Sequence, residues 1–384
     1  MAMLLAQMEL SGFHIDRTLL SGKIKAELTQ LKAMGKTLNE KFPGLNIFSN
    51  AQMKELLFKK MGFYPAKKTQ TGGICCDQTV LEEINKLYPQ AGIGTIVDFR
   101  KRYHKVKTEM VPMLKGSEKT GYIHTNYNLG AVVTGRLSSS DPNLQNITRN
   151  SPVREAMTSR FPNGRLVQFD YKGHEFVVWA TVANVKKALE LLKAGNDVHQ
   201  FLVDELAKGG VHINRQKAKG GNFSLIYGVG VSKLSKILNV GRKTAEQIHK
   251  AWHYLYPEAV RFHEKIRNQV NEKGYVENIF GHRRHLTLTG VHEEKQAYNF
   301  PIQSVAVELC YRGMLNVHSQ ILMHPNLKKE MIIVGQVHDS MVIDMTPLAM
   351  THIPKVEISM TQEVNTLTSH EFYLAVEHKI SPHF

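Results

Sequence analysis

Two apolar segments far apart in the chain each carry an aspartate near one end, and they constrain the fold more than any other feature. The first segment, residues 165–171, contains Asp170, and the second, residues 331–340, contains Asp339. Apolar runs of this length are typical of buried β-strands. Because a long and mostly helical stretch separates the two strands, a sheet that contains both needs non-local pairing around a helical insertion. The sequence therefore predicts an α+β fold.

Helical and strand-like patterns account for most of the remaining chain. Leu20, Ile24, Leu28, Leu31, Met34 and Leu38 recur every three or four positions, as on the buried face of a helix. Ser49 and Asn50 begin a second helix, because a short polar side chain there can accept from free backbone amides. Residues 67–73 read as a polar loop. We also expect helices over residues 93–111, most of 185–290 and about 304–323, strands at 122–127 and 131–137, and a loop at 138–146.

The composition is that of a basic globular protein. The chain has 384 residues, enough for two or three subdomains, and 42% of them are hydrophobic. Its formal net charge of +15 favours polyanions, nucleic acid first among them, with a merely soluble basic surface as the alternative.

Cysteine content and hydropathy exclude several classes of protein. Cys75, Cys76 and Cys310 are too few and too badly placed for a disulfide framework or a zinc cluster. No apolar run approaches the roughly 18 residues that span a bilayer, and the first ten residues do not resemble a signal peptide. We expect a soluble, cytoplasmic protein with no membrane partner.

The two aspartates suit divalent metal ions if the fold brings them together. Like charges about 4 Å apart repel by about 4 kcal/mol at an effective dielectric constant near 20. Mg²⁺ would relieve this repulsion, because it prefers oxygen ligands and completes its shell with water and substrate phosphates. Two such ions can activate an attacking hydroxyl and stabilise a leaving oxygen. The alternative is that either aspartate is an ordinary turn residue.

A stripe of two cations and two aromatic residues lies on one predicted helix. Arg215, Lys219, Phe223 and Tyr227 are spaced by four, so all of them stay on one face. Asn214 is a suitable N-cap, which places both cations in the first turns, where they oppose the helix dipole. A bound triphosphate would compensate for this penalty. Gly220 and Gly221 permit close approach of another backbone or a base pair. The alternative is an amphipathic helix with an aromatic core edge.

A dense basic run accompanies these features. It comprises Arg100, Lys101, Arg102, His104, Lys105 and Lys107. Such a run is either a solvated helix face or a clamp on backbone phosphates.

Five ordered blocks resemble the polymerase part of family A DNA polymerases, the bacterial DNA polymerase I group. Phe169-Asp170-Tyr171 with Glu175 resembles motif A, the stripe with Gly228 matches motif B, and Val337-His338-Asp339 resembles motif C. Residues 134–147 are similar to the family's primer-template block, and residues 299–303 to its later template block. Residues 8–13 and 71–72 are more loosely similar to its thumb.

The resemblance implies a right-hand polymerase with helical thumb and fingers and an antiparallel-sheet palm. It divides the chain into a thumb (1–115), a first part of the palm with motif A (116–185), fingers with the motif B helix (186–290) and a second part of the palm with motif C (291–384). It implies a DNA-directed DNA polymerase, expected to be monomeric, that adds deoxynucleotides to a primer on template DNA.

The resemblance also implies a role for each matching residue. The catalytic and metal-binding set is Asp170, Asp339 and Tyr171, with two Mg²⁺ ions and Mn²⁺ as a substitute. Arg215, Lys219, His199, Phe223 and Tyr227 are expected to bind the nucleotide, and Glu175 to exclude a ribose 2′-hydroxyl. The DNA-binding set is Arg136, Gln145, Asn146, Lys295, Asn299, Gln303 and His338.

The sequence departs from the family pattern at several positions. Ser340 stands where the family usually has glutamate, so a third acidic group near the metals is absent. Lys172-Gly173-His174 replaces the common serine, glutamine and aliphatic residue, which removes a side chain that helps to hold the steric gate. The chain also begins almost where the thumb does, without the family's proofreading exonuclease, as expected of an excised fragment or of a protein whose other activities lie on a separate segment.

Two other functions stay open at this point. A non-catalytic nucleic-acid clamp would bind DNA in a salt-sensitive way without incorporating nucleotides, and Ser340 supports it. A single-subunit RNA polymerase has similar motifs, but Glu175 argues against it.

Overall fold

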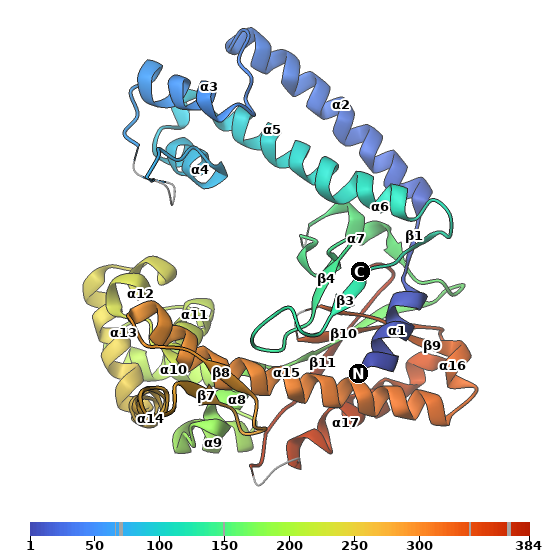
Figure 1. Cartoon of the computed structure of the whole chain (residues 1–384), viewed down its shortest axis with the longest axis vertical. Helices are drawn as coiled ribbons and strands as arrows, with labels where there is room; N and C mark the ends of the chain where they lie inside the picture. Colours follow the sequence, from blue (N-terminus) through green and yellow to red (C-terminus); the bar gives the residue numbers. More distant parts are fainter. Residues whose placement is uncertain (66, 69–71, 149, 338, 367–369) are drawn as a thin grey trace. The chain divides into compact units, whose positions relative to one another are not determined.

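A four-stranded antiparallel sheet contains both aspartate segments of the computed structural model. Its strand order is β11-β6-β10-β9, and the strands are β6 (Arg165–Tyr171), β9 (Met331–Val337), β10 (Ser340–Met345) and β11 (Val376–Ser381). Strand β6 thus pairs only with strands that follow the helical insertion. The expected α+β fold and non-local pairing are confirmed (Figure 1).

The structure describes residues 1–65, 67–68, 72–148, 150–337, 339–366 and 370–384. They form two compact units. The first unit comprises Met1–Gly12, Thr125–Gln145 and Ser159–Pro382, and the second comprises Phe13–His124, Asn146–Thr158 and His383–Phe384. The division into thumb, palm and fingers stays a prediction.

Helices dominate the first unit around this sheet. The longest, α15, contacts α8, α14 and α17, and helices α11 to α14 gather beside one end of it (Figure 1). The helices are α1 (Ala2–Ser11), α8 (His174–Val182), α9 (Lys186–Lys193), α10 (Val198–Lys208), α11 (Arg215–Ile226), α12 (Val231–Leu238), α13 (Arg242–Leu255), α14 (Glu258–Lys273), α15 (Val291–Met323), α16 (Leu327–Glu330) and α17 (Ile353–Thr361), with short 3₁₀ turns η4 (Leu144–Asn146), η5 (Ala349–His352) and η6 (Val364–Thr366). Two hairpin-like pairs complete this unit, β3 (Asn126–Asn128) with β4 (Ser138–Ser140) and β7 (Tyr275–Glu277) with β8 (Arg283–His285).

The core of the first unit includes two stacked tryptophans. Trp179 and Trp252 are fully buried, with ring centroids 5.4 Å apart and an interplanar angle of 26°. Tyr256 meets both rings edge-on. Aromatic packing of this kind fixes α8 against α13.

The second unit is built on long helices and a small sheet. Its three-stranded sheet has the order β2-β1-β5. The elements are β1 (Phe13–Ile15), α2 (Arg17–Lys41), α3 (Asn50–Lys54) with the π-helical turn η1 (Glu55–Lys60), α4 (Gln78–Leu87), η2 (Pro89–Ala91), α5 (Gly94–Lys105) continued by η3 (Val106–Met110) and α6 (Val111–Gly116), β2 (Tyr122–Ile123), α7 (Pro152–Ala156) and β5 (Met157–Thr158).

Local signals in the sequence are confirmed at the helix starts. Ser49 caps α3 by accepting from the Gln52 amide, and Asn214 caps α11 by accepting from the Lys217 amide. On α2, four of the six predicted core positions are buried, whereas Leu28 is 49% exposed.

Four predicted elements are wrong in extent or type. The loop predicted at 138–146 contains the strand β4 and the 3₁₀ turn η4, because residues 138–140 pair with β3. Residues 131–137 are not a strand, and Val132 and Val133 lie on the surface rather than on a buried sheet face. Residues 122–127 divide between β2 and β3, which belong to different sheets. Helix α15 begins at Val291 rather than near Ser304, and it continues through Pro301. Burial of Phe300, Pro301 and their neighbours offsets the hydrogen bond that proline removes.

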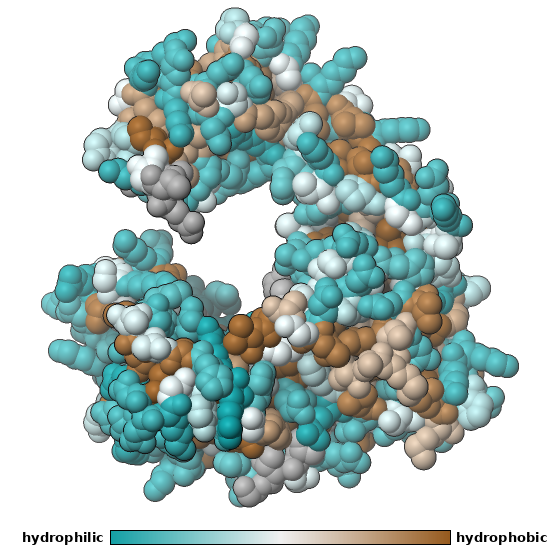
Figure 2. All heavy atoms as spheres, viewed as in Figure 1, coloured by the Kyte–Doolittle hydropathy of each residue, from teal (hydrophilic) through white to brown (hydrophobic). Residues whose placement is uncertain are grey.

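The surface is mostly hydrophilic where it covers α13 and α14 (Figure 2). In the described part of the chain, no helix is long and apolar enough to cross a membrane.

Candidate active site

Sheet register brings the two aspartates together. Strand β10 pairs with β6 so that Ser340 lies opposite Asp170, and Asp339 immediately precedes Ser340. Burial, followed by the charges of Asp339 and Glu377, raises the pKa of Asp170, while Lys219 opposes the rise. A cation bound beside two neighbouring carboxylates reduces the repulsion between them, and this repulsion is one cause of the raised pKa. The pair therefore fits a divalent metal site.

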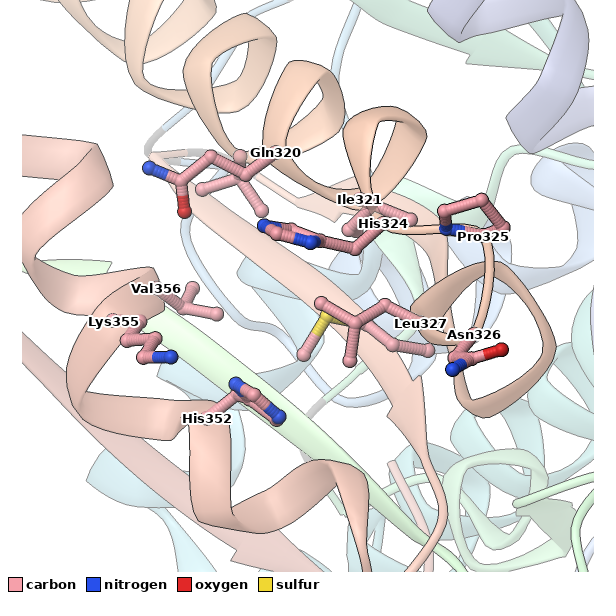
Figure 3. A pocket seen from close by; sticks show the side chains of 11 residues that line it. Gln320, Ile321, His324, Pro325, Asn326, Leu327, His352, Lys355 and Val356 are labelled. Atoms are coloured by element: carbon pink, nitrogen blue, oxygen red, sulfur yellow. The ribbon is translucent and has the colours of Figure 1, made fainter.

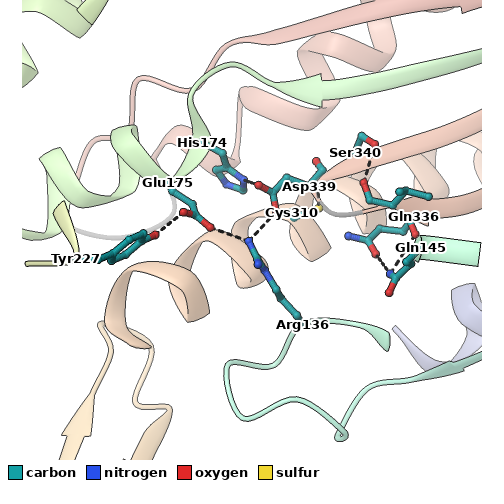
Figure 4. Close-up of polar contacts among 10 residues, drawn as sticks. Arg136, Gln145, His174, Glu175, Tyr227, Cys310, Gln336, Asp339 and Ser340 are labelled. Carbon is teal, nitrogen blue, oxygen red and sulfur yellow. Dashed lines mark hydrogen bonds and ion pairs between the residues drawn. The ribbon is translucent and has the colours of Figure 1, made fainter. Parts of the chain in front are cut away.

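Asp339 lies between a guanidinium and an imidazole (Figure 4). Its Oδ1 is 3.6 Å from Nη2 of Arg136, and its Oδ2 is 3.9 Å from Nδ1 of His174. The buried thiol of Cys310 donates to the Asp339 carbonyl at 3.8 Å. Burial, followed by the charge of Asp339, raises the pKa of that thiol. Sequence reasoning missed Cys310, since no local pattern distinguishes it from a core residue.

Glu175 joins Arg136 to Tyr227. Its Oε1 lies 2.7 Å from Nη2 of Arg136, and the Tyr227 hydroxyl donates to its Oε2 (Figure 4). Glu175 stands in the first turn of α8, just after Gly173, whose φ of 58° and ψ of 31° favour glycine. Gly173, one of the residues that depart from the family pattern, thus allows the backbone conformation that starts α8.

The predicted stripe follows α11 and ends at its C-cap. Arg215, Lys219 and Phe223 lie on the helix, and Tyr227 caps it. The Lys219 ammonium lies 5.9 Å from the Phe223 ring centroid. Nε of Arg215 is 2.7 Å from Oδ2 of Asp197, and both side chains are about half exposed. The structure thus brings both cations to one side of the helix, with Arg215 already paired to a carboxylate.

The glycines of α11 allow close helix packing within the first unit. A Cβ added to Gly220 would lie 3.3 Å from Cδ2 of Leu238, and one added to Gly221 would lie 3.8 Å from Cδ1 of the same side chain. The close neighbour of these glycines in the described residues is therefore α12.

His199 is buried at the start of α10 rather than open to solvent. Its Nδ1 lies 2.9 Å from Nδ2 of Asn222, and its residue exposure is 5%. Burial is the main cause that lowers the pKa of His199 to about 4, so the ring is neutral at pH 7. Asp197 caps the same helix and accepts from the His199 and Gln200 amides. Asp197 could have been found from its place before the helix, whereas nothing in the sequence distinguishes Asn222.

Three predicted DNA-binding residues share one face of α15. Lys295, Asn299 and Gln303 are partly exposed and spaced by four, while Ala297, Tyr298 and most neighbouring residues are buried. Residues four apart differ by about 40° around the helix axis, so the three side chains stay on one face.

The other DNA-binding residues are placed differently. Gln145 donates from Nε2 to Oε1 of Gln336 at 2.9 Å and to its carbonyl at 3.2 Å. Asn146 belongs to the second unit. His338 lies outside the described residues.

Tyr171 turns its side chain away from Asp170, whereas the Ser340 hydroxyl is engaged within the sheet. The Tyr171 hydroxyl donates to the Met360 carbonyl at 2.8 Å, so Tyr171 could reach a metal through its backbone carbonyl. The Ser340 hydroxyl donates to the Val337 carbonyl and accepts from Nε2 of Gln168, both at 2.8 Å. Ser340 therefore ties β10 to β6.

Glu377 is a further acidic residue that sequence reasoning missed. It lies opposite Asp170 on the edge strand β11 and is exposed. Among the residues that the structure describes, no group of three or more His, Cys, Asp or Glu side chains could hold a metal ion.

A separate pocket of about 380 Å³ lies between the end of α15 and the turns around α16 and α17 (Figure 3). Its walls are mostly apolar, as at Val317 and Val356, with His324, His352 and Lys355 at its edge. None of the predicted site residues lines it.

Comparison with known proteins identifies the family. A family model described as DNA polymerase family A matches residues 18–384. DNA polymerase I of Rhizobium leguminosarum is 32% identical over 367 residues, covering 88% of this chain and 35% of that protein. The enzyme of Pseudomonas aeruginosa is 31% identical over 368 residues, covering 88% and 39%.

The fold agrees with a solved structure. The POL domain of Pol1 from M. smegmatis, solved in complex with DNA primer-template and dNTP, matches with a TM-score of 0.85 and 22% identity, covering 99% of this chain and 68% of that one. The expected right-hand polymerase fold is confirmed. The chain spans 35% and 39% of the length of the two curated relatives. By its sequence match and its fold, the chain belongs to DNA polymerase family A.

Proposed function

We propose that this chain is a template-directed DNA polymerase that joins deoxynucleotides to a primer 3′-hydroxyl and releases pyrophosphate. The observation that carries the proposal is the register that sets Asp339 beside Asp170 in the sheet. The cationic stripe on α11 and the partly exposed face of α15 add sites for a triphosphate and for DNA. We propose primer-template DNA and deoxynucleoside triphosphates as partners, and a monomer that works in the cytoplasm.

Asp170 and Asp339 would hold two Mg²⁺ ions, with Mn²⁺ as a substitute. Family A DNA polymerases generally use divalent metal ions, and carboxylate oxygens are the ligands that Mg²⁺ prefers. Bound there, the ions would lower the pKa of the attacking hydroxyl and stabilise the leaving oxygen of an in-line displacement. The two carboxylates fix the place of the reaction relative to β6 and β10.

The side chains of α11 would position the nucleotide. Lys219 and Arg215 bind the triphosphate, and Arg215 exchanges its carboxylate partner Asp197 for phosphate. Phe223 stacks near the sugar and base, and Tyr227 closes the pocket. His199, neutral and buried, offers a hydrogen bond rather than a charge to the phosphates.

Contacts to DNA would come from α15 and from residues on either side of β4. Lys295, Asn299 and Gln303 face one direction, which suits a duplex that runs along the helix. Arg136 and Gln145 contact the primer end. We include Asn146 and His338 in this set on the resemblance alone.

Primer extension with Mg²⁺ and four deoxynucleotides tests the proposal. Asp170→Ala and Asp339→Ala should each lower the single-turnover rate by roughly 1000-fold or more, because the ions contribute several kcal/mol of transition-state stabilisation. Asp204→Ala is the matched control, since Asp204 is exposed on α10 of the same unit. Extension by either active-site variant at the rate of the control would refute the mechanism.

A further inference from the structure

His174 is a buried polar side chain that has no hydrogen-bond partner among the residues that the structure describes. It is the first residue of α8 and is 3% exposed, and within this part of the chain neither Nδ1 nor Nε2 forms a hydrogen bond. A buried polar group without a partner costs about 1–3 kcal/mol, so native proteins seldom keep one without a use. An aliphatic residue would fill this place at less cost to stability.

The imidazole faces a carboxylate. Its Nδ1 lies 3.9 Å from Oδ2 of Asp339 (Figure 4). Because an ionised carboxylate only accepts, the tautomer that suits this pair has its hydrogen on Nδ1.

Arg136 and His174 both lie beside Asp339, but they differ in how firmly they are placed. The Arg136 side chain is 33% exposed and already shares its Nη2 with Glu175 at 2.7 Å. In the proposed function Arg136 turns toward DNA. The His174 side chain is 2% exposed and is held against the Tyr171 ring, with centroids 4.6 Å apart. His174 therefore stays beside Asp339 when Arg136 moves.

We propose that His174 is a positioning residue that donates a hydrogen bond from Nδ1 to Asp339 and fixes the orientation of that carboxylate. The inference rests on the proposed function. A movement of about 1 Å, or a rotation of the carboxylate, brings the two atoms within hydrogen-bond distance. The Ser340 side chain does not take this role, because it bonds to Val337 and Gln168.

Three variants separate the hydrogen bond from the packing. In His174→Asn the amide nitrogen can stand where Nδ1 stands, whereas in His174→Gln it stands one bond further away. His174→Leu removes the donor and keeps an apolar side chain. Single-turnover primer extension is measured against Mg²⁺ and against nucleotide concentration, and DNA affinity is measured separately.

We expect His174→Leu and His174→Gln to lose about 10- to 100-fold in maximal rate, as is typical when a partner of a metal ligand is removed. The Mg²⁺ concentration for half-maximal rate should rise, while the KM for nucleotide and the Kd for DNA stay within about 2-fold. His174→Asn should recover most of the rate. His174→Leu should be at least as stable to urea as the parent chain, which a purely structural role of the imidazole would not allow.

Equal rates and equal Mg²⁺ dependence in the parent chain and His174→Leu would overturn the inference, and so would equally slow His174→Asn and His174→Gln. If His174→Leu folds poorly, the comparison of His174→Asn with His174→Gln decides. The Asp170→Ala and Asp339→Ala variants keep the two proposals apart. If they are inactive while His174→Leu is normal, only the inference about His174 fails.

Discussion

Both carboxylate oxygens of Glu175 accept hydrogen bonds, one of them from Tyr227. Arg136 holds Oε1, and the Tyr227 hydroxyl donates to Oε2. Burial, followed by the Glu175 charge, raises the pKa of Tyr227, so the hydroxyl remains a donor. This hydrogen bond thus fixes both the side chain that is proposed to exclude the 2′-hydroxyl and the side chain that is proposed to close the nucleotide pocket.

Removal of the Glu175 side chain should therefore relax the choice of sugar. We expect Glu175→Ala to raise kcat/KM for ribonucleotides relative to deoxynucleotides by roughly 10- to 100-fold, about 1–3 kcal/mol of lost discrimination in a tight pocket. Single-nucleotide incorporation with matched ribo- and deoxynucleotides measures it. Glu190→Ala, on the exposed face of α9, is the control. An unchanged ratio would show that another group excludes the 2′-hydroxyl.

The individual site residues show what sequence can and cannot predict. The place of Asp170 and Asp339 beside each other in the sheet could be predicted because each lies near the end of an apolar run, and the cap Asn214 because helix caps have a local signature. The ion pair of Arg136 with Glu175 and the place of His174 beside Asp339 were not predictable. They depend on which strands and loops pack together, and that information is spread over the whole chain.

At the scale of elements, Asn222 connects three helices. It lies in the middle of α11 and is fully buried. Its Oδ1 accepts from Nε1 of Trp252 on α13 at 2.8 Å, and its Nδ2 lies 2.9 Å from Nδ1 of His199 on α10. One amide group thus satisfies two buried polar groups on neighbouring helices.

Replacement of this amide by an apolar side chain should be costly. Asn222→Leu leaves the Trp252 and His199 nitrogens without partners, so we expect it to lower the free energy of unfolding by about 2–4 kcal/mol. Urea unfolding followed by tryptophan fluorescence measures the change. Gln216→Ala, at an exposed position of α11, should change stability by less than about 0.5 kcal/mol. Equal effects of the two substitutions would contradict a structural role for Asn222.

The elements themselves were predictable where periodicity is strong. The amphipathic pattern of α2 and the apolar strands β6 and β9 were found from sequence. Helix α15 was predicted to begin near Ser304, whereas tertiary packing stabilises it from Val291 and through Pro301. Residues 131–137 were wrongly predicted as a strand, because branched residues favour strands whether or not the fold pairs them with another strand.

At the scale of the molecule, two neutral histidines, His199 buried and His253 half-buried, make the first unit sensitive to acid. Burial is the first cause that lowers the pKa of His199 and of His253 to about 4. The unfolded chain has histidine pKa values near 6.5. As the pH falls from about 6.5 toward 4, the unfolded chain binds protons that the folded chain does not, so the free energy of unfolding decreases. Above about pH 6.5 this contribution is constant.

Urea midpoints at pH 7.5, 6.5 and 5.5 check this dependence. We expect the midpoint of the first unit to change little from pH 7.5 to 6.5 and to fall from pH 6.5 to 5.5, before most carboxylates titrate. His253→Phe keeps an aromatic ring beside Trp252 and should reduce the fall. The prediction is wrong if the midpoint rises toward pH 5.5 or if the variant responds as steeply as the parent chain.

The two tryptophans of the sequence both lie in the core of the first unit, whereas Cys75 is the one partly exposed thiol, since Cys76 and Cys310 are buried. Cys75 belongs to the second unit. Mild alkylation should therefore attach a fluorescent acceptor to the second unit alone, while the tryptophans serve as donors in the first unit. Energy transfer from the tryptophans to the acceptor on Cys75 would report the separation of the two units in solution, with and without a DNA duplex. No substitution in the chain is needed for this measurement.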